Sequence, residues 1–236
     1  MHDEPRITTA YLVRHGQTAW NRERRFQGHL DIPLDEAGLQ QAAAVAAWLR
    51  DQPVSFQAIY SSDLVRATQT ACAIGNRVGL APQLVPALRE IHCGQWAGLS
   101  AWEVDERYPG QLQRWAATVD RFTLPGGESV PEVQQRAVAF FSDAMQRHEA
   151  GTIVIVAHGV VLSTLLIALH RWNLLDAWHD ARAKMGNTGV TIVQWDSQTA
   201  TCTMPLFNSL VHLADGSAHA SLPEAQAAMP RGGALW

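Results

Sequence analysis

The sequence contains little cysteine and no long apolar run, and each of these absences excludes a class of protein. Its 3 cysteines, Cys72, Cys93 and Cys202, are widely spaced and form no CxxC pair. This argues against a disulfide framework and against a structural zinc site, and it fits a reducing compartment. No apolar run reaches the roughly 18 residues of a membrane span, because Ser163 and Thr164 interrupt the longest one. We therefore expect no membrane span.

Net positive charge is also absent. The formal net charge of −4 argues against binding to nucleic acid, since proteins that contact phosphate backbones are usually basic. The first five residues lack the basic and apolar blocks of a signal peptide, so a cytoplasmic location is expected. Lys184 is the only lysine among the 18 basic residues. All the others are arginines, which suit bidentate contacts to phosphate.

Segments of strand and helix type alternate along the chain. At 236 residues, 47% of them apolar and 17% charged, the chain is long enough for a large α/β domain of ordinary globular composition. The alternation predicts a largely parallel sheet covered by helices on both faces. The expected strands cover residues 8–13, 58–60, 84–85, 152–157, 190–195 and 202–206. The expected helices cover residues 36–49, 64–78, 129–147 and 160–170.

Particular residues mark the expected helix ends. Asp35 and Ser129 are candidate N-caps, and Glu132 follows Ser129 at the spacing of a capping box. Gly79 is expected to end the helix 64–78. For the helix 36–49, the helical spacing predicts an apolar face made of Leu39, Ala43, Ala46 and Leu49.

Residues 90–127 are less regular and rich in aromatic side chains. We interpret about 91–127 as an insertion with short helices that covers the strand ends as a lid. The rest of residues 1–207 is expected to form the same single domain. Residues 208–236, rich in alanine, proline and glycine, are expected to be a C-terminal tail with little core.

Two strands end in a histidine followed by a glycine. The first expected strand continues into Arg14-His15-Gly16, and the strand 152–157 continues into His158-Gly159. Open α/β sheets place their ligand crevice outside the carboxyl ends of the strands, so the two histidines are expected to share one crevice.

A further cation is expected at the same edge of the sheet. The strand 58–60 leads through Ser61-Ser62-Asp63 into a helix whose first turn carries Arg66. Helix N-termini favour anions through their free N–H groups and the helix dipole. Two arginines and two histidines in one crevice of an acidic protein predict a site for a phosphate group.

A series of short motifs resembles, in content and in order, the motifs of the histidine phosphatase superfamily, also called the phosphoglycerate mutase-like family. They span residues 8 to about 195 and comprise Leu12–Thr18, Trp20-Asn21, Gln27-Gly28, Pro33-Leu34, Ser61–Thr70, Leu88–Ile91, Gly94–Gly98, Pro125–Ser129 and Val156–Gly159. The resemblance implies a three-layer αβα sandwich with a mainly parallel central sheet.

The resemblance also implies a role for each candidate site residue. His15 is then the nucleophile that becomes a phosphohistidine, and Glu90 protonates the leaving oxygen and afterwards activates water. The phosphate oxygens are held by Arg14, Asn21, Arg66, His158 and the amide of Gly159. No metal or other cofactor is implied, because the arginines carry the charge. His29 and His92 are expected to be structural or only to line the pocket.

The family contains phosphatases and mutases, and the lid favours the former. Residues 91–125 lack lysine and carry Arg107, Arg114 and Arg121 separately, whereas mutases of this family use paired arginines and a lysine there. We therefore expect metal-independent hydrolysis of a small phosphomonoester. A phosphoglycerate mutase dependent on 2,3-bisphosphoglycerate is the alternative, and a non-catalytic phospho-ligand binding protein is a third reading. The expected partner is a small phosphorylated metabolite, a homodimer is left open, and the physiological substrate is not identified.

Overall fold

Strand β1 (Ile7–Arg14) lies inside a six-stranded sheet with the strand order β3-β2-β4-β1-β5-β6. The computed structural model describes residues 6–199 and 201–214. Strands β1 to β4 are parallel, and β5 and β6 add an antiparallel hairpin beside β1. The further strands are β2 (Ala58–Ser61), β3 (Pro82–Leu84), β4 (Thr152–Ala157), β5 (Val190–Asp196) and β6 (Thr201–Ser209). The predicted α/β fold with a mostly parallel sheet is confirmed.

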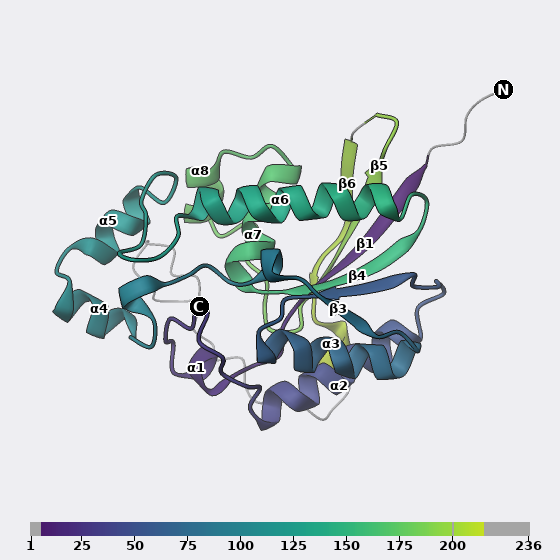
Figure 1. Ribbon diagram of the computed structural model, residues 1–236, viewed down its shortest axis with the longest axis horizontal. Coiled ribbons are helices and arrows are strands. Elements are labelled where there is room, and N and C mark those ends of the chain that lie inside the picture. Colours follow the sequence, from purple (N-terminus) through teal and green to yellow (C-terminus); the bar gives the residue numbers. More distant parts are fainter. Residues whose placement is uncertain (1–5, 200, 215–236) are drawn as a thin grey trace.

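Helices cover both faces of this sheet, so the chain forms three layers (Figure 1). The α-helices are α1 (Ala19–Arg22), α2 (Glu36–Arg50), α3 (Val65–Val78), α4 (Ala101–Arg107), α5 (Gln111–Ala117), α6 (Val130–Arg147), α7 (Gly159–Leu169) and α8 (Leu174–His179). Short 3₁₀ turns are η1 (Pro86–Leu88), η2 (Gly94–Trp96) and η3 (Val211–Leu213). Helices α6 and α7 lie on one face, and α2 and α3 lie on the other. The sequence did not predict α8.

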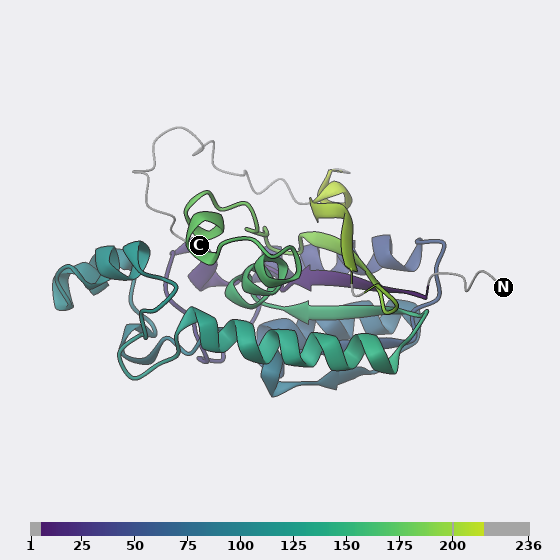
Figure 2. The ribbon, with the colours of Figure 1, turned by 90° about the horizontal axis from the view of Figure 1, so that it is seen from above.

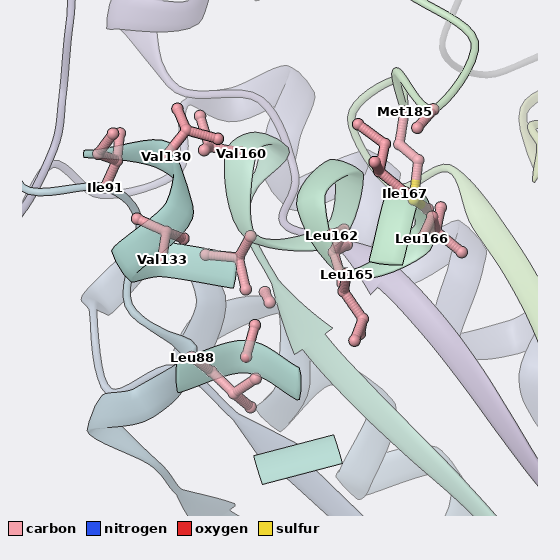
Figure 3. Packing of buried hydrophobic residues seen from close by; sticks show 14 of the residues in the cluster. Leu88, Ile91, Val130, Val133, Val160, Leu162, Leu165, Leu166, Ile167 and Met185 are labelled. Atoms are coloured by element: carbon pink, nitrogen blue, oxygen red, sulfur yellow. The ribbon is translucent and has the colours of Figure 1, made fainter. Parts of the chain in front are cut away.

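The strands are apolar on both sides because each side has its own core. In β1, Leu12 packs in the cluster of α6 and α7, whereas its neighbour Val13 packs with α2 and α3. Ile155 and Val156 of β4 alternate in the same way. Figure 3 shows part of the first cluster, including residues of α6 and α7. Burial on both faces explains the unbroken apolar runs that identified these strands in the sequence.

The residues predicted to cap helices do so. The Asp35 side chain accepts a hydrogen bond from the Gly38 amide at the start of α2, and Ser129 and Glu132 form the capping box of α6. Helix α3 ends at Gly79, whose φ of +76° is in the left-handed region that favours glycine.

The predicted buried face of α2 was partly wrong. Leu39 and Ala43 are exposed, and the buried residues are Gly38, Ala42, Val45, Ala46 and Leu49. Helix α2 carries small apolar residues around most of its circumference, so spacing alone does not define its orientation. The helix is turned so that Gly38 faces the loop after β1, where a Cβ on Gly38 would lie 2.0 Å from the Gln17 carbonyl oxygen.

The expected lid covers the end of the sheet where the parallel strands finish. Figures 1 and 2 both place α4 and α5 beyond this end, and in Figure 2 the arrows of β1 and β4 point toward them. The lid is anchored by aromatic rings. Trp115 packs against Trp96, Phe26 and Trp178, with ring centroids 5.8 to 6.0 Å apart.

The folded part continues beyond residue 207, where the sequence predicted a tail. Strand β6 runs to Ser209, and the Asn208 side chain accepts a hydrogen bond from the Gly186 amide. His212 of η3 hydrogen-bonds to Thr188. Residues 215–236 of the predicted tail lie outside the described part of the chain.

Within residues 6–199 and 201–214, no helix is both long and apolar enough to cross a membrane. Cys72, Cys93 and Cys202 are all unpaired.

Candidate active site

His15 follows β1 directly and lies at the base of a pocket. It is only 2% exposed, and its Nδ1 lies 2.7 Å from the carbonyl oxygen of Gly16. Since a carbonyl oxygen only accepts hydrogen bonds, Nδ1 carries the proton and Nε2 carries the lone pair. Burial, followed by the charges of Arg66 and Arg14, lowers the pKa of His15 well below its usual value. The imidazole is therefore neutral and nucleophilic at neutral pH.

His158 lies beside His15, because the strands β1 and β4 that the two histidines follow are parallel neighbours in the sheet. The two ring centroids are 5.1 Å apart. His158 is completely buried, and neither ring nitrogen has a hydrogen-bond partner among the described residues. Burial first, and then the charge of Arg66, lowers the pKa of His158 well below the ordinary value. A buried imidazole without a partner is costly unless a ligand supplies one.

Arg14 and Arg66 bring two buried positive charges to the same place. Arg66 is 1% exposed and donates to the carbonyl oxygens of Gly28 and Leu30, while Arg14 donates to that of Met185. The Nε atoms of both arginines are buried and have no partner in the described chain. Burial lowers the pKa of Arg66 to about 10 and also lowers the pKa of Arg14, so both remain cations at neutral pH. Two guanidinium groups with unused donors suit an anion.

Asn21 also lines the pocket. Its Oδ1 accepts hydrogen bonds from the amide and hydroxyl of Thr18, at 3.0 and 3.1 Å, and from the Asn187 side chain at 3.4 Å. These contacts orient the side-chain amide, so its Nδ2 remains available to donate to a ligand.

Glu90 faces the two arginines from the lid side of the pocket. Its carboxylate oxygens accept hydrogen bonds from the amides of Ile91 at 2.9 Å and Val160 at 3.2 Å. Gly159 begins α7 and lines a second, smaller pocket, which shares Arg14, Glu90 and Val160 with the first.

The structure thus gathers the predicted site residues around one crevice. Arg14, His15, Asn21, Arg66 and Glu90 line the main pocket, Gly159 lines the adjoining one, and the ring of His158 lies beside that of His15 at an interplanar angle of 58°. His29 and His92 line neither of these pockets, and their ring centroids are 4.9 Å apart.

Several pocket residues were missed by the sequence reasoning. Gln27 is buried, lines the pocket and accepts a hydrogen bond from Thr18, although it had been noted only as part of a motif. Asn187 lines neither pocket but donates to the carbonyl oxygen of His15 from 172 positions away. The apolar wall consists of Trp20, Phe26, Ile91, Trp115, Leu124 and Val160.

The charged residues at the pocket mouth are basic. Arg24 and Arg25 line it, and Arg25 is paired with Glu23 and Glu103. The adjoining pocket is lined by Lys184, whose pKa is lowered by burial and then by the charges of Arg14 and Arg24.

No group of three or more histidine, cysteine, aspartate or glutamate side chains that could hold a metal ion occurs in the part of the chain that the structure describes.

Comparison with known proteins identifies the family. The sequence profile of the histidine phosphatase superfamily, branch 1, matches residues 10–205, a range that contains every candidate site residue. A metal-independent phosphoserine phosphatase of Arabidopsis thaliana is 34% identical over 171 residues, covering 70% of each chain. A probable phosphoglycerate mutase of Yersinia pestis, GpmB, is 35% identical over 189 residues, covering 78% of this chain and 84% of that protein.

The fold agrees with this relationship. The native structure of a mycobacterial glucosyl-3-phosphoglycerate phosphatase matches with a TM-score of 0.75 and 33% identity, covering 86% of this chain and 100% of the other. With the paired histidines and arginines at the carboxyl ends of its parallel strands, this chain belongs to the histidine phosphatase superfamily.

Proposed function

We propose that the protein is a metal-independent phosphatase that hydrolyses a small phosphomonoester through a phosphohistidine at His15. The observation that carries the proposal is a neutral His15, with its lone pair on Nε2, in a pocket lined by Arg14 and Arg66. The unused donors of both arginines and of His158 fit the oxygens of a phosphate group.

The first step transfers the phosphoryl group to the protein. The Nε2 lone pair of His15 attacks phosphorus, and an N–P bond forms while the bond from phosphorus to the ester oxygen breaks. The electron pair of that bond goes to the leaving oxygen, which takes a proton from the Glu90 carboxyl group and departs as an alcohol. Arg14 and Arg66 balance the charge on the transferred group.

The second step returns the protein to its starting state. Glu90, now a carboxylate, takes a proton from a water molecule, whose oxygen attacks phosphorus. The N–P bond breaks, its electron pair returns to Nε2, and inorganic phosphate leaves. Because Nδ1 stays bonded to the Gly16 carbonyl, the same tautomer is ready for the next cycle.

A phosphoglycerate mutase is the second candidate, since one relative is named a probable mutase. A mutase must hold a bisphosphorylated intermediate while it turns around, which requires cations on the far wall of the pocket. Arg24 and Arg25 line the pocket from outside the lid, but the residues that the lid itself contributes are uncharged, namely Ile91, Cys93, Trp115 and Leu124. This favours hydrolysis.

One charge argument against a mutase does not hold. Acids of the lid would repel a polyanion if they stood at the entrance, but Glu103, Asp105, Glu106 and Asp120 do not line either pocket. Glu103 is paired with Arg25, and Asp120 with Arg121. The preference for hydrolysis therefore rests on the apolar lid wall.

The substrate we propose is a small phosphorylated metabolite, and the cellular location is the cytoplasm. The three unpaired cysteines fit a reducing compartment. A homodimer stays a prediction.

Phosphate release from sugar phosphates, phosphoserine, phosphoglycerates and nucleotides, measured with EDTA present, tests the proposal. We expect turnover of at least one ester, and an acid-labile phosphoryl group on the peptide that contains His15 after rapid quenching. Activity that EDTA removes and a divalent ion restores would contradict the metal-independent mechanism. In an enolase-coupled assay with 2,3-bisphosphoglycerate, exchange of the 2- and 3-phosphoglycerates faster than phosphate release would replace the phosphatase by the mutase.

A further inference from the structure

The backbone around Glu90 has no regular secondary structure to hold it. Residues 89–93 lie between η1 and η2 and belong to no helix or strand. Side chains supply the missing hydrogen bonds instead. The carbonyl oxygen of Glu90 accepts one from Nη2 of Arg136 at 3.0 Å and one from Nε2 of His29 at 2.7 Å.

Arg136 is itself firmly placed. It lies on α6, where its Nε and Nη2 form a two-point ion pair with the Glu128 carboxylate at 3.0 and 3.1 Å. Its Nη1 donates to the Ala87 carbonyl oxygen at 2.7 Å. Glu128 in turn accepts a hydrogen bond from the His92 amide at 2.8 Å. Arg136 and Glu128 therefore hold the segment before, at and after Glu90.

The apolar side of the same segment is anchored separately. Leu88 and Ile91 are buried in the cluster that also contains Val130, Val133 and Val160 of α6 and α7 (Figure 3). This packing fixes the depth of the segment, but it does not fix the rotation of the peptide that carries the Glu90 side chain. The hydrogen bonds from Arg136 and His29 to the Glu90 carbonyl oxygen fix that rotation, and Arg136 also ties it to α6.

We propose that Arg136 is a positioning residue for the acid-base group, Glu90. Arg136 holds the Glu90 backbone so that the Glu90 carboxyl group stays opposite the leaving oxygen. The inference rests on the proposed function, because it assigns Glu90 the proton transfer. Arg136 is not among the residues that line the pocket, so it acts through Glu90 and not on the substrate.

The test compares two phosphate esters with different leaving groups. Ethyl phosphate needs a proton on its leaving oxygen, whereas 4-nitrophenyl phosphate leaves without one. In Arg136→Gln we expect kcat/KM for ethyl phosphate to fall by about 10²-fold, within the range typical of general acid catalysis. For 4-nitrophenyl phosphate we expect a fall of only a few fold. Glu90→Gln should show the same contrast, and the double variant should be no worse than Glu90→Gln alone.

A merely structural role for Arg136 predicts a different result. Equal losses on both esters, or a double variant with the two losses added, would overturn the inference. Turnover of 4-nitrophenyl phosphate by the unaltered protein tests the proposed function separately. Arg147→Gln is the matched control, since Arg147 is exposed at the end of the same helix and pairs with Asp143. If Arg136→Gln does not fold, Glu128→Gln removes one charge from the ion pair and should show the same contrast with smaller losses.

Discussion

The backbones of Gly16 and Gly38 are in direct contact, since a Cβ on Gly16 would lie 2.5 Å from the carbonyl oxygen of Gly38. The contact joins the loop that carries His15 to the first turn of α2. The Gly16 amide is also held by the Thr70 hydroxyl of α3, at 3.1 Å. The position of the nucleophile therefore depends on how closely both helices approach.

Gly38→Ala should lower both stability and activity. Alanine normally favours a helix, but here its Cβ would lie 2.0 Å from the Gln17 carbonyl oxygen, so the loop must move. We expect a loss of about 1–3 kcal/mol in the free energy of unfolding and a fall in kcat. Chemical denaturation and steady-state kinetics measure the two effects. Ala43→Gly, on the exposed face of the same helix, is the control and should leave kcat unchanged.

His15→Asn should abolish turnover and leave the fold intact. Asparagine can keep a hydrogen bond near the Gly16 carbonyl oxygen but has no nucleophilic nitrogen, so kcat should fall by at least about 10⁴-fold. Phosphate release and circular dichroism are the measurements. The variant must be prepared without contamination by the unaltered protein. Activity of this preparation within tenfold of that of the unaltered protein would contradict the assignment of the nucleophile.

Stability should decrease as the pH falls below about 6.5, the usual histidine value. Burial lowers the pKa values of His15 and His158 well below this value in the folded chain. The unfolded chain therefore binds more protons than the folded chain in this range, and each histidine contributes a slope of up to about 1.4 kcal/mol per pH unit. Denaturant unfolding between pH 7.5 and 5.5 measures the slope, and His158→Gln should reduce it. Equal stability across this range would show that the pair is not buried as neutral imidazoles.

Arg24→Gln should affect substrates that carry a carboxylate more than substrates without one. Arg24 lines the pocket mouth and is exposed, so its interaction with a second anionic group is worth about two- to fivefold in kcat/KM. O-phosphoserine and ethyl phosphate give the comparison. Arg22→Gln provides the control, because Arg22 is an exposed residue of α1 outside the pocket lining. An equal effect on both esters would show that Arg24 does not contact the second group.

The sequence predicted those parts of the fold that local chemistry determines. Asp35, Ser129 and Gly79 marked helix ends correctly because capping depends on the residue itself and a few neighbours. The residues that end β1 and β4 could be placed in one crevice because parallel strands in one sheet finish at the same edge.

Other features depend on contacts that no local pattern records. Arg136 reaches the Glu90 carbonyl oxygen over 46 positions, and Asn187 reaches that of His15 over 172. Helix propensity cannot predict such long-range hydrogen bonds. The predicted buried face of α2 was partly wrong for the same reason. The contact of Gly38 with a distant loop decides which side of the helix is buried.

The neutral imidazole of His158 has no hydrogen-bond partner among the described residues, so a bound ligand can change its protonation. We expect a phosphate dianion bound beside it to raise the pKa of the ring, so that binding takes up protons from solution. The heat of phosphate binding should then depend on the ionisation enthalpy of the buffer. The affinity for the phosphate dianion should increase as the pH falls. Calorimetry in two buffers at one pH counts these protons directly.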